Sequence, residues 1–219
     1  MHYIDLHTHQ IKESSAFQLL NVFAQDLPLA VDANHYSVGL HPWHLEKVNI
    51  EECMGWMEQA MDQKNVLAIG ECGLDRSVAS DLSLQEKYFS LQVALAQRHS
   101  KPLIIHCVRA FPELVKLKKE LKSTVPWIIH GYSGNEETTR ALIKHDFYFS
   151  VGEGMLIHPT KSNVLSLIPS DHLFFETDDR AISISSIYLL ASKLLNTEQQ
   201  TLQAIIYENF KRLFGEQNG

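Results

Sequence analysis

The sequence predicts an α/β fold, a TIM-like (β/α)8 barrel with reduced N-terminal helices, formed by residues 1–219 as a single domain. Three observations predict this fold class. Eight short apolar runs have the composition of buried strands. Amphipathic helical patterns separate these runs from the third one onward. The stretch between His9 and His35 has room for one strand but not for two full helices. An open doubly wound sheet is the competing architecture, but no glycine-rich turn follows the first strand.

The expected strands share a short run of apolar, β-rich residues. They are His2–Leu6, Phe17–Phe23, His35–Leu40, Val66–Glu71, Leu103–His106, Trp127–His130, Phe147–Val151 and Leu173–Glu176.

The expected helices lie between these runs. A capping box at Ser83–Glu86 begins a helix whose apolar face is Leu84, Tyr88, Leu91 and Leu95. Helices are also expected at Ala110–Leu121, with Phe111, Leu114, Val115 and Leu121 on one face, and at Asn135–Lys144 and Ile184–Leu195. A second capping box at Thr197–Gln200 precedes a helix that places Leu202, Ile205, Ile206 and Leu213 inward.

Composition narrows the class of protein. The 219 residues are 45% hydrophobic with a formal net charge of -7, which disfavours a dedicated duplex-binding protein. Three cysteines without paired spacing predict free thiols in a reducing compartment. The sequence has neither a signal-peptide pattern nor an apolar run of about 20 residues, so we expect a cytoplasmic monomer without membrane contact.

Titratable side chains stand repeatedly at the ends of the expected strands, where barrel enzymes carry their catalytic groups. These residues are His7, His9, His41, Glu71, His106, His130 and Asp178. A single histidine in such a place is usually a satisfied core or loop residue. Seven titratable groups at one level of the barrel instead predict a functional site.

The residue types indicate a metal site. Histidine and carboxylate in this ratio favour Zn, Mn, Fe or Mg over a soft cysteine site. Six ligand side chains exceed what one tetrahedral ion uses, so we expect two divalent metal ions (Zn, Mg or Mn), with Glu71 bridging them. A metal lowers the pKa of its bound water, and Asp178 is expected to ligate and orient that water or to accept its proton. A buried histidine–carboxylate hydrogen-bond network without metal is the structural alternative.

An ordered set of motifs spans Asp5 to Gly215: "DLHTH", "GLHPWH", "AIGECGLD", "QEKYFSLQVALAQRHSKPLIIHC", "IIHGYSG", "FYFSVG", "FETDD" and "NFKRLFG". This set resembles the TatD family of metal-dependent hydrolases, within the amidohydrolase superfamily. The resemblance implies a TIM-like barrel, a di-metal site and hydrolase activity, and several family members are described as deoxyribonucleases with exonuclease activity.

The resemblance also implies roles for individual residues. The metal ligands would be His7, His9, Glu71, His106, His130 and Asp178, with Asp178 and Glu71 as the catalytic groups. His41 and Ser133 match positions near the substrate, and Arg109 could contact a phosphate. The sequence departs from the family pattern at Arg76, at Arg109 and in the "DDRAIS" that follows "ET", which alters expected substrate loops and leaves the ligands intact.

Three functional hypotheses follow. The leading one is a metal-dependent hydrolase of phosphoester bonds, a TatD-type deoxyribonuclease acting on single strands or ends of DNA or on a small phosphoester. The alternative is hydrolysis of a small amide, ester or lactone by the same site, because fold does not fix substrate. A metal-holding protein without turnover is the third.

The role of Trp43 has two interpretations. Its side chain either stacks on a base or packs beside the loop proline.

Overall fold

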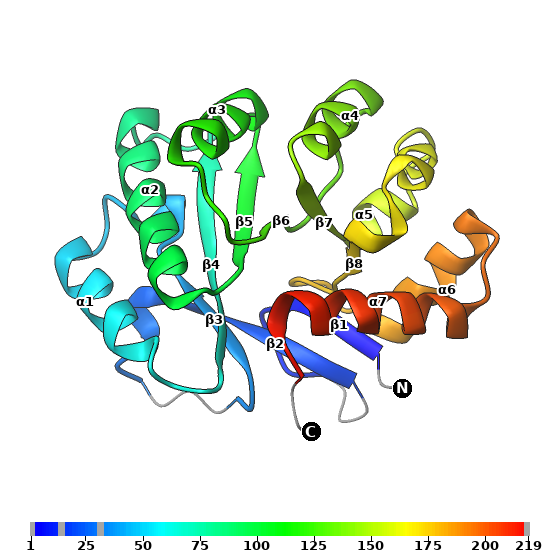
Figure 1. Cartoon of the computed structure of the whole chain (residues 1–219), viewed down its shortest axis with the longest axis horizontal. Helices are drawn as coiled ribbons and strands as arrows, with labels where there is room; N and C mark the ends of the chain where they lie inside the picture. The colour runs from blue at the N-terminus through cyan, green and yellow to red at the C-terminus, as the bar shows by residue number, and fades with distance from the viewer. Residues whose placement is uncertain (1–2, 13–15, 30–32, 217–219) are drawn as a thin grey trace. The chain divides into compact units, whose positions relative to one another are not determined.

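The computed structural model describes residues 3–12, 16–29 and 33–216 (Figure 1). These residues form two compact units, which are described separately. The terminal unit comprises residues 1–19 and 128–219, and the central unit comprises residues 20–127. The first residue of the expected strand His2–Leu6 lies outside the described residues. That the whole chain forms a single domain stays a prediction.

The central unit is built on parallel strands that neighbour one another in chain order. Its strands are β2 (Ala16–Phe23), which begins in the terminal unit, β3 (Tyr36–Gly39), β4 (Val66–Asp75) and β5 (Leu103–Val108). Its helices are α1 (Ile50–Ala60), α2 (Leu82–His99) and α3 (Phe111–Leu121). Short 3-10 turns, η1 (Ala24–Asp26) and η2 (Pro42–His44), follow β2 and β3. Helix α2 runs alongside β4 (Figure 1).

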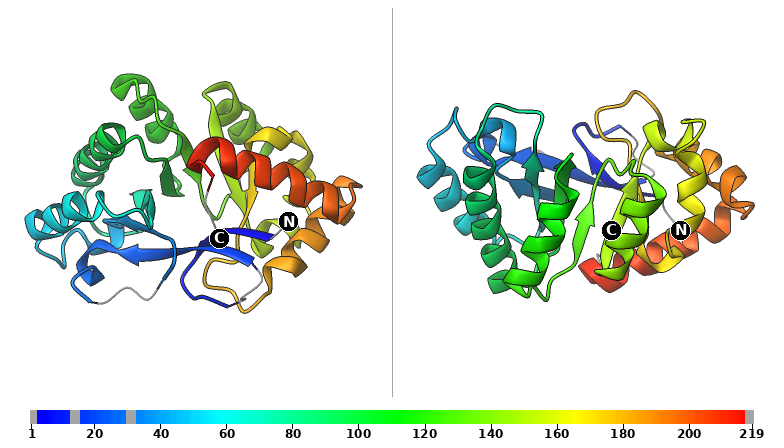
Figure 2. Two further views of the ribbon diagram at one scale, coloured as in Figure 1. Left: turned by 60° about the horizontal axis from the view of Figure 1, so that its bottom comes forward. Right: turned by 90° about the horizontal axis from the view of Figure 1, so that it is seen from above.

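The terminal unit joins the two ends of the chain. Its strands are β1 (Tyr3–Thr8), β6 (Trp127–Ile129), which begins at the last residue of the central unit, β7 (Phe147–Val151) and β8 (Leu173–Phe175). Its helical segments are α4 (Glu136–Lys144), α5 (Glu153–Leu156), η3 (Ser162–Leu167), η4 (Ser170–His172), α6 (Ile184–Leu195) and α7 (Gln199–Phe214). Helices α6 and α7 lie side by side in both Figure 1 and Figure 2.

The contact between the last strand and the first distinguishes a barrel from an open sheet. β7 pairs with β8 in parallel, and Thr8 at the end of β1 forms a parallel bridge with Asp178 just after β8. A barrel requires this contact between its last and first strands, whereas an open sheet in chain order lacks it. Residues 9–15 alone separate β1 from β2, too few for a crossover helix. The predicted reduction of the N-terminal helices is confirmed.

Both predicted capping boxes are wrong. The side chain of Asp81 accepts a hydrogen bond from the Ser83 amide, so α2 begins at Leu82, and the Ser83 hydroxyl donates to the same carboxylate. The Thr197 hydroxyl donates to the Leu195 carbonyl and thereby closes the turn after α6. In both places the hydroxyl donates to a residue two positions earlier in the chain and does not cap the helix that follows.

Helix α1 was not among the predicted helices.

The buried face of α2 also differs from the prediction. Leu91 is 44% exposed, and Leu84 and Tyr88 are only half-buried. The face that turns inward is Gln85, Phe89, Gln92, Val93, Leu95 and Ala96. Both glutamines are buried because their amides bind the backbone beyond β3 and β4: Gln92 bonds both the Leu40 amide and its carbonyl, at 2.8 and 3.1 Å.

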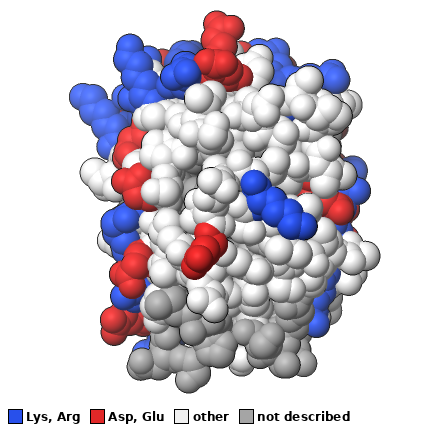
Figure 3. All heavy atoms as spheres, turned by 90° about the vertical axis from the view of Figure 1, so that its right-hand side faces the viewer, with Lys and Arg blue, Asp and Glu red and all other residues white. Residues whose placement is uncertain are grey.

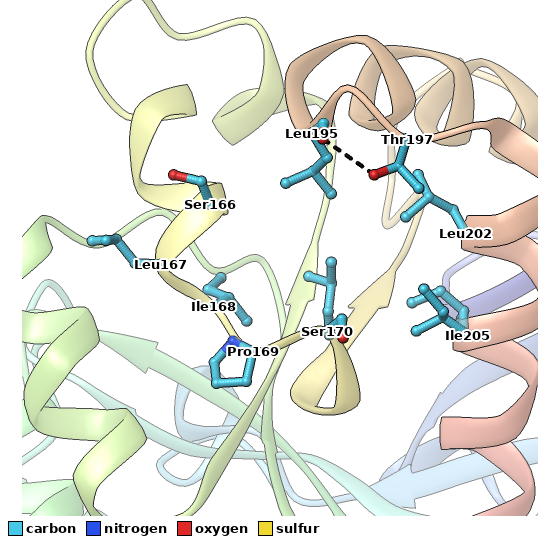
Figure 4. A pocket seen from close by; sticks show the side chains of 11 residues that line it. Ser166, Leu167, Ile168, Pro169, Ser170, Leu195, Thr197, Leu202 and Ile205 are labelled. Atoms are coloured by element: carbon cyan, nitrogen blue, oxygen red, sulfur yellow. Dashed lines mark hydrogen bonds between the residues drawn. The ribbon is translucent and has the colours of Figure 1, made fainter.

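An apolar hollow of about 360 Å³ lies inside the terminal unit, between η3–η4 and the α6–α7 turn (Figure 4). Its lining is mostly leucine, isoleucine and proline, and the Thr197 hydroxyl on its wall is already bonded to Leu195. The surface on the side of α6 shows few charged side chains at its centre (Figure 3), and α6 exposes Leu189 and Leu194. Across the described residues, every helix is too short or too polar to cross a membrane.

Replacing Gln92 by methionine tests its structural role. Gln92→Met keeps the side-chain volume but leaves the Leu40 amide and carbonyl without their partner inside the protein. We expect the free energy of unfolding to fall by about 2 to 4 kcal/mol, measured by urea denaturation. Gln97→Met, at a half-buried position of the same helix, serves as control and should change stability by less than about 0.5 kcal/mol.

Candidate metal-binding site

The terminal unit gathers three metal-type donors at the end of β1. His7 is on β1 and His9 directly follows its last residue, Thr8, and the two ring centroids lie 5.1 Å apart. Asp178, just after β8, places Oδ1 3.6 Å from His7 Nε2 and 3.3 Å from His9 Nε2. We call His7, His9 and Asp178 the terminal cluster.

The spacing in the terminal cluster suits a metal ion. Zinc bound at 2.0 to 2.2 Å in a tetrahedron separates its ligand atoms by about 3.4 Å. The two Asp178 distances bracket that value, and all three donor atoms lie within 4.8 Å of one another. Two imidazoles and a carboxylate are also the ligand types that Zn and Mn accept. The residue types and these distances therefore fit a divalent metal.

Backbone contacts hold Asp178 in this position. Its amide donates to the His7 carbonyl at 2.9 Å, and the His9 amide donates to the Asp178 carbonyl at 3.3 Å. Asp178 has a left-handed backbone, φ +51°, which aspartate tolerates better than most residues. Burial alone would raise the pKa of Asp178, but the hydrogen bond from His9 and the nearby imidazoles of His130 and His7 lower it to about 2. The carboxylate is therefore ionised at neutral pH.

Glu176 adds a carboxylate that the sequence analysis did not assign. His130 follows β6, and its ring centroid lies 4.2 Å from that of His7. Glu176 is fully buried; its Oε1 accepts a hydrogen bond from the Gly131 amide at 2.5 Å and lies 3.6 Å from His130 Nδ1. A carboxylate behind a ligating histidine orients the ring and raises its basicity. Glu176 therefore holds the turn that carries His130, and its carboxylate, with His130 and Asp178, could also hold a metal ion.

Asp5 is a second unassigned acid in this unit. Its carboxylate accepts hydrogen bonds from the Thr177 amide at 2.9 Å and the Thr177 hydroxyl at 2.7 Å. Burial raises the pKa of Asp5 to about 6, although the Thr177 and Gln18 hydrogen bonds oppose the rise. Since Thr177 stands between Glu176 and Asp178, Asp5 fixes the segment that carries both acids.

The central unit contains another group of imidazoles and carboxylates, on β4 and β5 and shortly after β3. Glu71 Oε1 lies 3.0 Å from His41 Nε2 and 2.9 Å from His106 Nδ1. The other ring nitrogen of His106 lies 2.9 Å from Asp75 Oδ2. We call His41, Glu71, His106 and Asp75 the central cluster. All four side chains are buried.

The hydrogen bonds assign a tautomer to His41. Its Nδ1 accepts from the Trp43 amide at 3.1 Å, so that nitrogen carries a lone pair. In the neutral ring the proton is then on Nε2, which donates to Glu71. With this tautomer His41 orients the Glu71 carboxylate, although its ring nitrogen, Glu71 and His106 together lie close enough to hold a metal ion.

His106 lies between two carboxylates. A neutral imidazole has one N–H and can donate to Glu71 or to Asp75, but not to both. Burial alone would raise the pKa of Asp75, but hydrogen bonds from His106, Ser77 and Trp43 hold it well below its usual range. With Asp75 taking the proton of Nε2, the lone pair of Nδ1 faces Glu71, and a cation there satisfies both atoms. The donor set thus fits a metal on the Glu71 side of the ring.

Two glycines allow this close approach. A Cβ on Gly70 would lie 2.4 Å from the Ile104 carbonyl oxygen, and one on Gly73 would lie 2.0 Å from that of His106. The backbones of β4 and β5 can therefore approach only because these positions have no side chain. Asn21 on β2 also holds Glu71, because its Oδ1 accepts from the Glu71 amide at 2.8 Å.

The six predicted ligands lie on or shortly after strands of their own units, with Glu71 in the middle of β4 and His106 within β5, and their role as ligands stays a prediction. The predicted substrate contacts lie nearby along the chain. Ser133 is half-buried, three residues after His130, and Arg109 is exposed directly after β5 with a left-handed backbone, φ +54°. The residues that the sequence analysis missed are Asp5, Asp75 and Glu176. Strand alternation was an available signal, since it places Asp5 on the face of His7.

Comparison with known proteins identifies the class and then the family. The chain is 30% identical over 201 residues to the metal-dependent hydrolase YabD of Bacillus subtilis, covering 84% of this chain and 78% of YabD. It is 30% identical over 149 residues to the 3'-5' ssDNA/RNA exonuclease TatD of Pantoea ananatis, covering 65% of this chain and 56% of that protein. The protein is a metal-dependent hydrolase. The model of TatD related DNases matches residues 23–215, and the chain belongs to that family.

A solved structure shows the fold. YjjV, a TatD homologue from Escherichia coli, superposes with a TM-score of 0.83 over 98% of both chains at 21% identity. The predicted TIM-like barrel with parallel strands is thereby confirmed.

Neutralising Asp178 tests the terminal cluster. Asp178→Asn keeps the shape but removes the charge that faces His7 and His9, so we expect affinity for Zn or Mn to fall by more than about 100-fold in calorimetric titration. Asp179→Asn is the matched control, because Asp179 is exposed and pairs only at the surface with Arg180 among the described residues. Equal affinities in the two variants would contradict the assignment.

Asp75 tests the support of the central cluster. Asp75→Asn removes the carboxylate that takes the His106 proton, so we expect metal affinity to fall by about 10- to 100-fold, measured by competition with a chelator. Asp62→Asn, at an exposed position in the same unit, should leave the affinity unchanged. An undiminished affinity in Asp75→Asn would remove Asp75 from this role.

Proposed function

We propose that this protein is a metal-dependent nuclease that hydrolyses phosphodiester bonds of single-stranded DNA or RNA, starting from an end. The observation that carries the proposal is the terminal cluster, where two imidazoles and an ionised carboxylate have the spacing of a metal coordination shell. The 3'-5' ssDNA/RNA exonuclease TatD of Pantoea ananatis is a relative with that activity in its name. The formal net charge of -7 favours strands and ends over extended contact with a duplex.

The residues of the terminal cluster have distinct parts in this reaction. Bound divalent metal supplies Lewis acidity and a water molecule of lowered pKa. His7 is buried, while the side chains of His9 and Asp178 are 27% and 33% exposed and face solvent, where a substrate can reach them. Asp178, ionised at neutral pH, orients the attacking water and accepts its proton. Glu176 keeps His130 in one orientation behind these groups.

Of the remaining predicted ligands, His130 lies beside the terminal cluster, and the central cluster supplies Glu71 and His106. We include a second divalent ion there in the proposal, with Zn, Mg and Mn as the candidate metals for both positions. His41 holds the Glu71 carboxylate in place. The bridging role of Glu71 stays a prediction from the sequence.

Ser133 and Arg109 complete the proposal as phosphate contacts. A serine hydroxyl and an arginine guanidinium both donate to phosphate oxygens, and the guanidinium can donate two parallel hydrogen bonds. Arg109 stands three residues after His106, at the end of β5, and its exposure leaves its donors open to substrate.

A nuclease assay tests the proposal. End-labelled single-stranded DNA should lose mononucleotides in the presence of Mg or Mn, and EDTA should abolish the release. The double variant Asp178→Asn, His130→Ala should reduce turnover by at least about 1,000-fold, because it removes both the predicted base and a ligand. Asp179→Asn should retain the parent activity.

Two outcomes would overturn the proposal. Unchanged turnover in the double variant would mean that the reaction takes place elsewhere. Hydrolysis of N-acyl amino acids or lactones, with no release from DNA or RNA under the same metal conditions, would assign the site to small amides or esters.

A further inference from the structure

Trp43 combines exposure with tight anchoring. The residue is 50% exposed, which is unusual for tryptophan. Its indole Nε1 nevertheless donates to Asp75 Oδ2 at 2.7 Å, and its amide donates to His41 Nδ1 at 3.1 Å. The turn η2 begins with Pro42, whose ring restricts the backbone just before Trp43. The indole is therefore fixed in place although half of the residue faces solvent.

The fixed indole adjoins the central cluster. Its ring centroid lies 4.7 Å from that of His41 and 5.7 Å from that of His106, and both pairs have an interplanar angle of 76°. The carboxylate of Asp75 that accepts from Trp43 also accepts from His106. A group bound on the exposed part of the indole is thus next to the residues that we assign to phosphodiester hydrolysis.

A hollow of about 510 Å³ opens beside Trp43. Pro42, Val78 and Ala79 give it an apolar wall, and the exposed Lys47 contributes a positive charge to its lining. Ser80 fixes the far wall, because its hydroxyl donates to the Pro42 carbonyl at 3.4 Å. The Gln85 amide of α2 donates to the carbonyl of the same serine at 3.0 Å. The hollow is therefore formed by segments that are already held in position.

We propose that this hollow is a subsite for the nucleobase adjacent to the scissile phosphodiester, which stacks on the indole of Trp43. The proposal rests on the proposed nuclease function and specifies its substrate as an unpaired, base-bearing nucleotide. Every base presents a π-face, so an aromatic platform binds single strands with little regard to sequence. A base that is paired and stacked in a duplex has no free face to offer. Because the indole is already immobilised, stacking costs little additional side-chain entropy.

The apolar wall and the lysine support a base and its backbone together. Pro42, Val78 and Ala79 offer no side-chain hydrogen-bonding groups, so they accept the flat face or edge of a base without selecting its sequence. Lys47 provides a point charge for a phosphate of the same strand. Glu46 also lines the hollow and limits its positive potential, so the aromatic face carries most of the attraction.

The test compares two substitutions at Trp43 on matched substrates. Trp43→Phe keeps an aromatic face but loses the hydrogen bond to Asp75, whereas Trp43→Leu loses both. Trp56→Leu, on α1 in the same unit, is the control for removing a tryptophan. The substrates are a single-stranded oligonucleotide and the same oligonucleotide with an abasic site at the terminal or penultimate nucleotide.

Stacking predicts a loss that depends on the base. Trp43→Leu should lower kcat/KM on the intact oligonucleotide by between about 5-fold and about 150-fold, mostly through KM. On the substrate that lacks the stacked base, Trp43→Leu and Trp43→Phe should be equal within about 2-fold, because both variants have lost the same hydrogen bond to Asp75. Trp43→Phe should keep most of the parent activity on the intact oligonucleotide.

An equal loss in Trp43→Leu on intact and abasic substrates, accompanied by an equal loss in Trp43→Phe, would overturn the proposal. Trp43 would then act only through Asp75 and His106. Equal activity of all variants on the intact substrate would overturn it as well.

A binding measurement separates this proposal from the nuclease assignment. In the Trp56→Phe background with EDTA, the remaining tryptophans are Trp43 and the fully buried Trp127. Titration with a short oligothymidylate should quench the Trp43 emission, and an abasic oligomer should not. If no variant hydrolyses nucleic acid but quenching occurs, the nuclease function fails and the stacking subsite stands. If hydrolysis occurs without quenching, the subsite fails and the nuclease function stands.

Discussion

The pairing of one buried carboxylate, Glu71, determines the arrangement of the central unit around it. An ionised carboxylate away from water costs several kcal/mol unless opposite charges or hydrogen-bond donors compensate it. His41, two residues after β3, supplies a hydrogen-bond donor at 3.0 Å, and the His106 ring on β5 lies 2.9 Å from the same Glu71 oxygen. These contacts therefore hold the segment after β3, and strand β5, against the middle of β4. Through His106 the same requirement reaches Asp75 and, beyond it, the indole of Trp43.

Environment rather than residue type separates the acids of the terminal unit. Asp178 has imidazoles around it and remains ionised, whereas burial brings the pKa of Asp5 to about 6. Both Asp5 oxygens accept hydrogen bonds from Thr177 and thereby hold the backbone there. Glu176 accepts a hydrogen bond from the Gly131 amide and holds the turn after β6. Three carboxylates that look alike in the sequence thus have a chemical role, a backbone role and an orienting role.

Prediction from the sequence succeeded where an apolar run ended in a titratable residue. His7, Glu71 and His106 all mark such points, and their strands were recognisable from composition alone, although β4 continues past Glu71 to Asp75 and β5 past His106 to Val108. It failed where a polar side chain was buried for structural reasons. Gln92 counts as polar in any periodicity, so the inward face of α2 was assigned to Leu84 and Leu91 in error, while Leu95 was placed correctly. Asp75 was overlooked because its partners, His106 and Trp43, are distant in the sequence.

The spacing of the two buried glutamines of α2 fixes the distance between the backbone segments that they bind. Gln85 and Gln92 are seven residues apart, close to two full turns, so both face the strands together. One bonds the backbone at Asp75 and Ser80, and the other bonds the backbone at Leu40. Inserting or deleting a single residue between them would rotate one glutamine by about 100° away from its strand. The spacing within α2 is therefore far less free to vary than its solvent-facing composition, since it sets the separation of two strand ends.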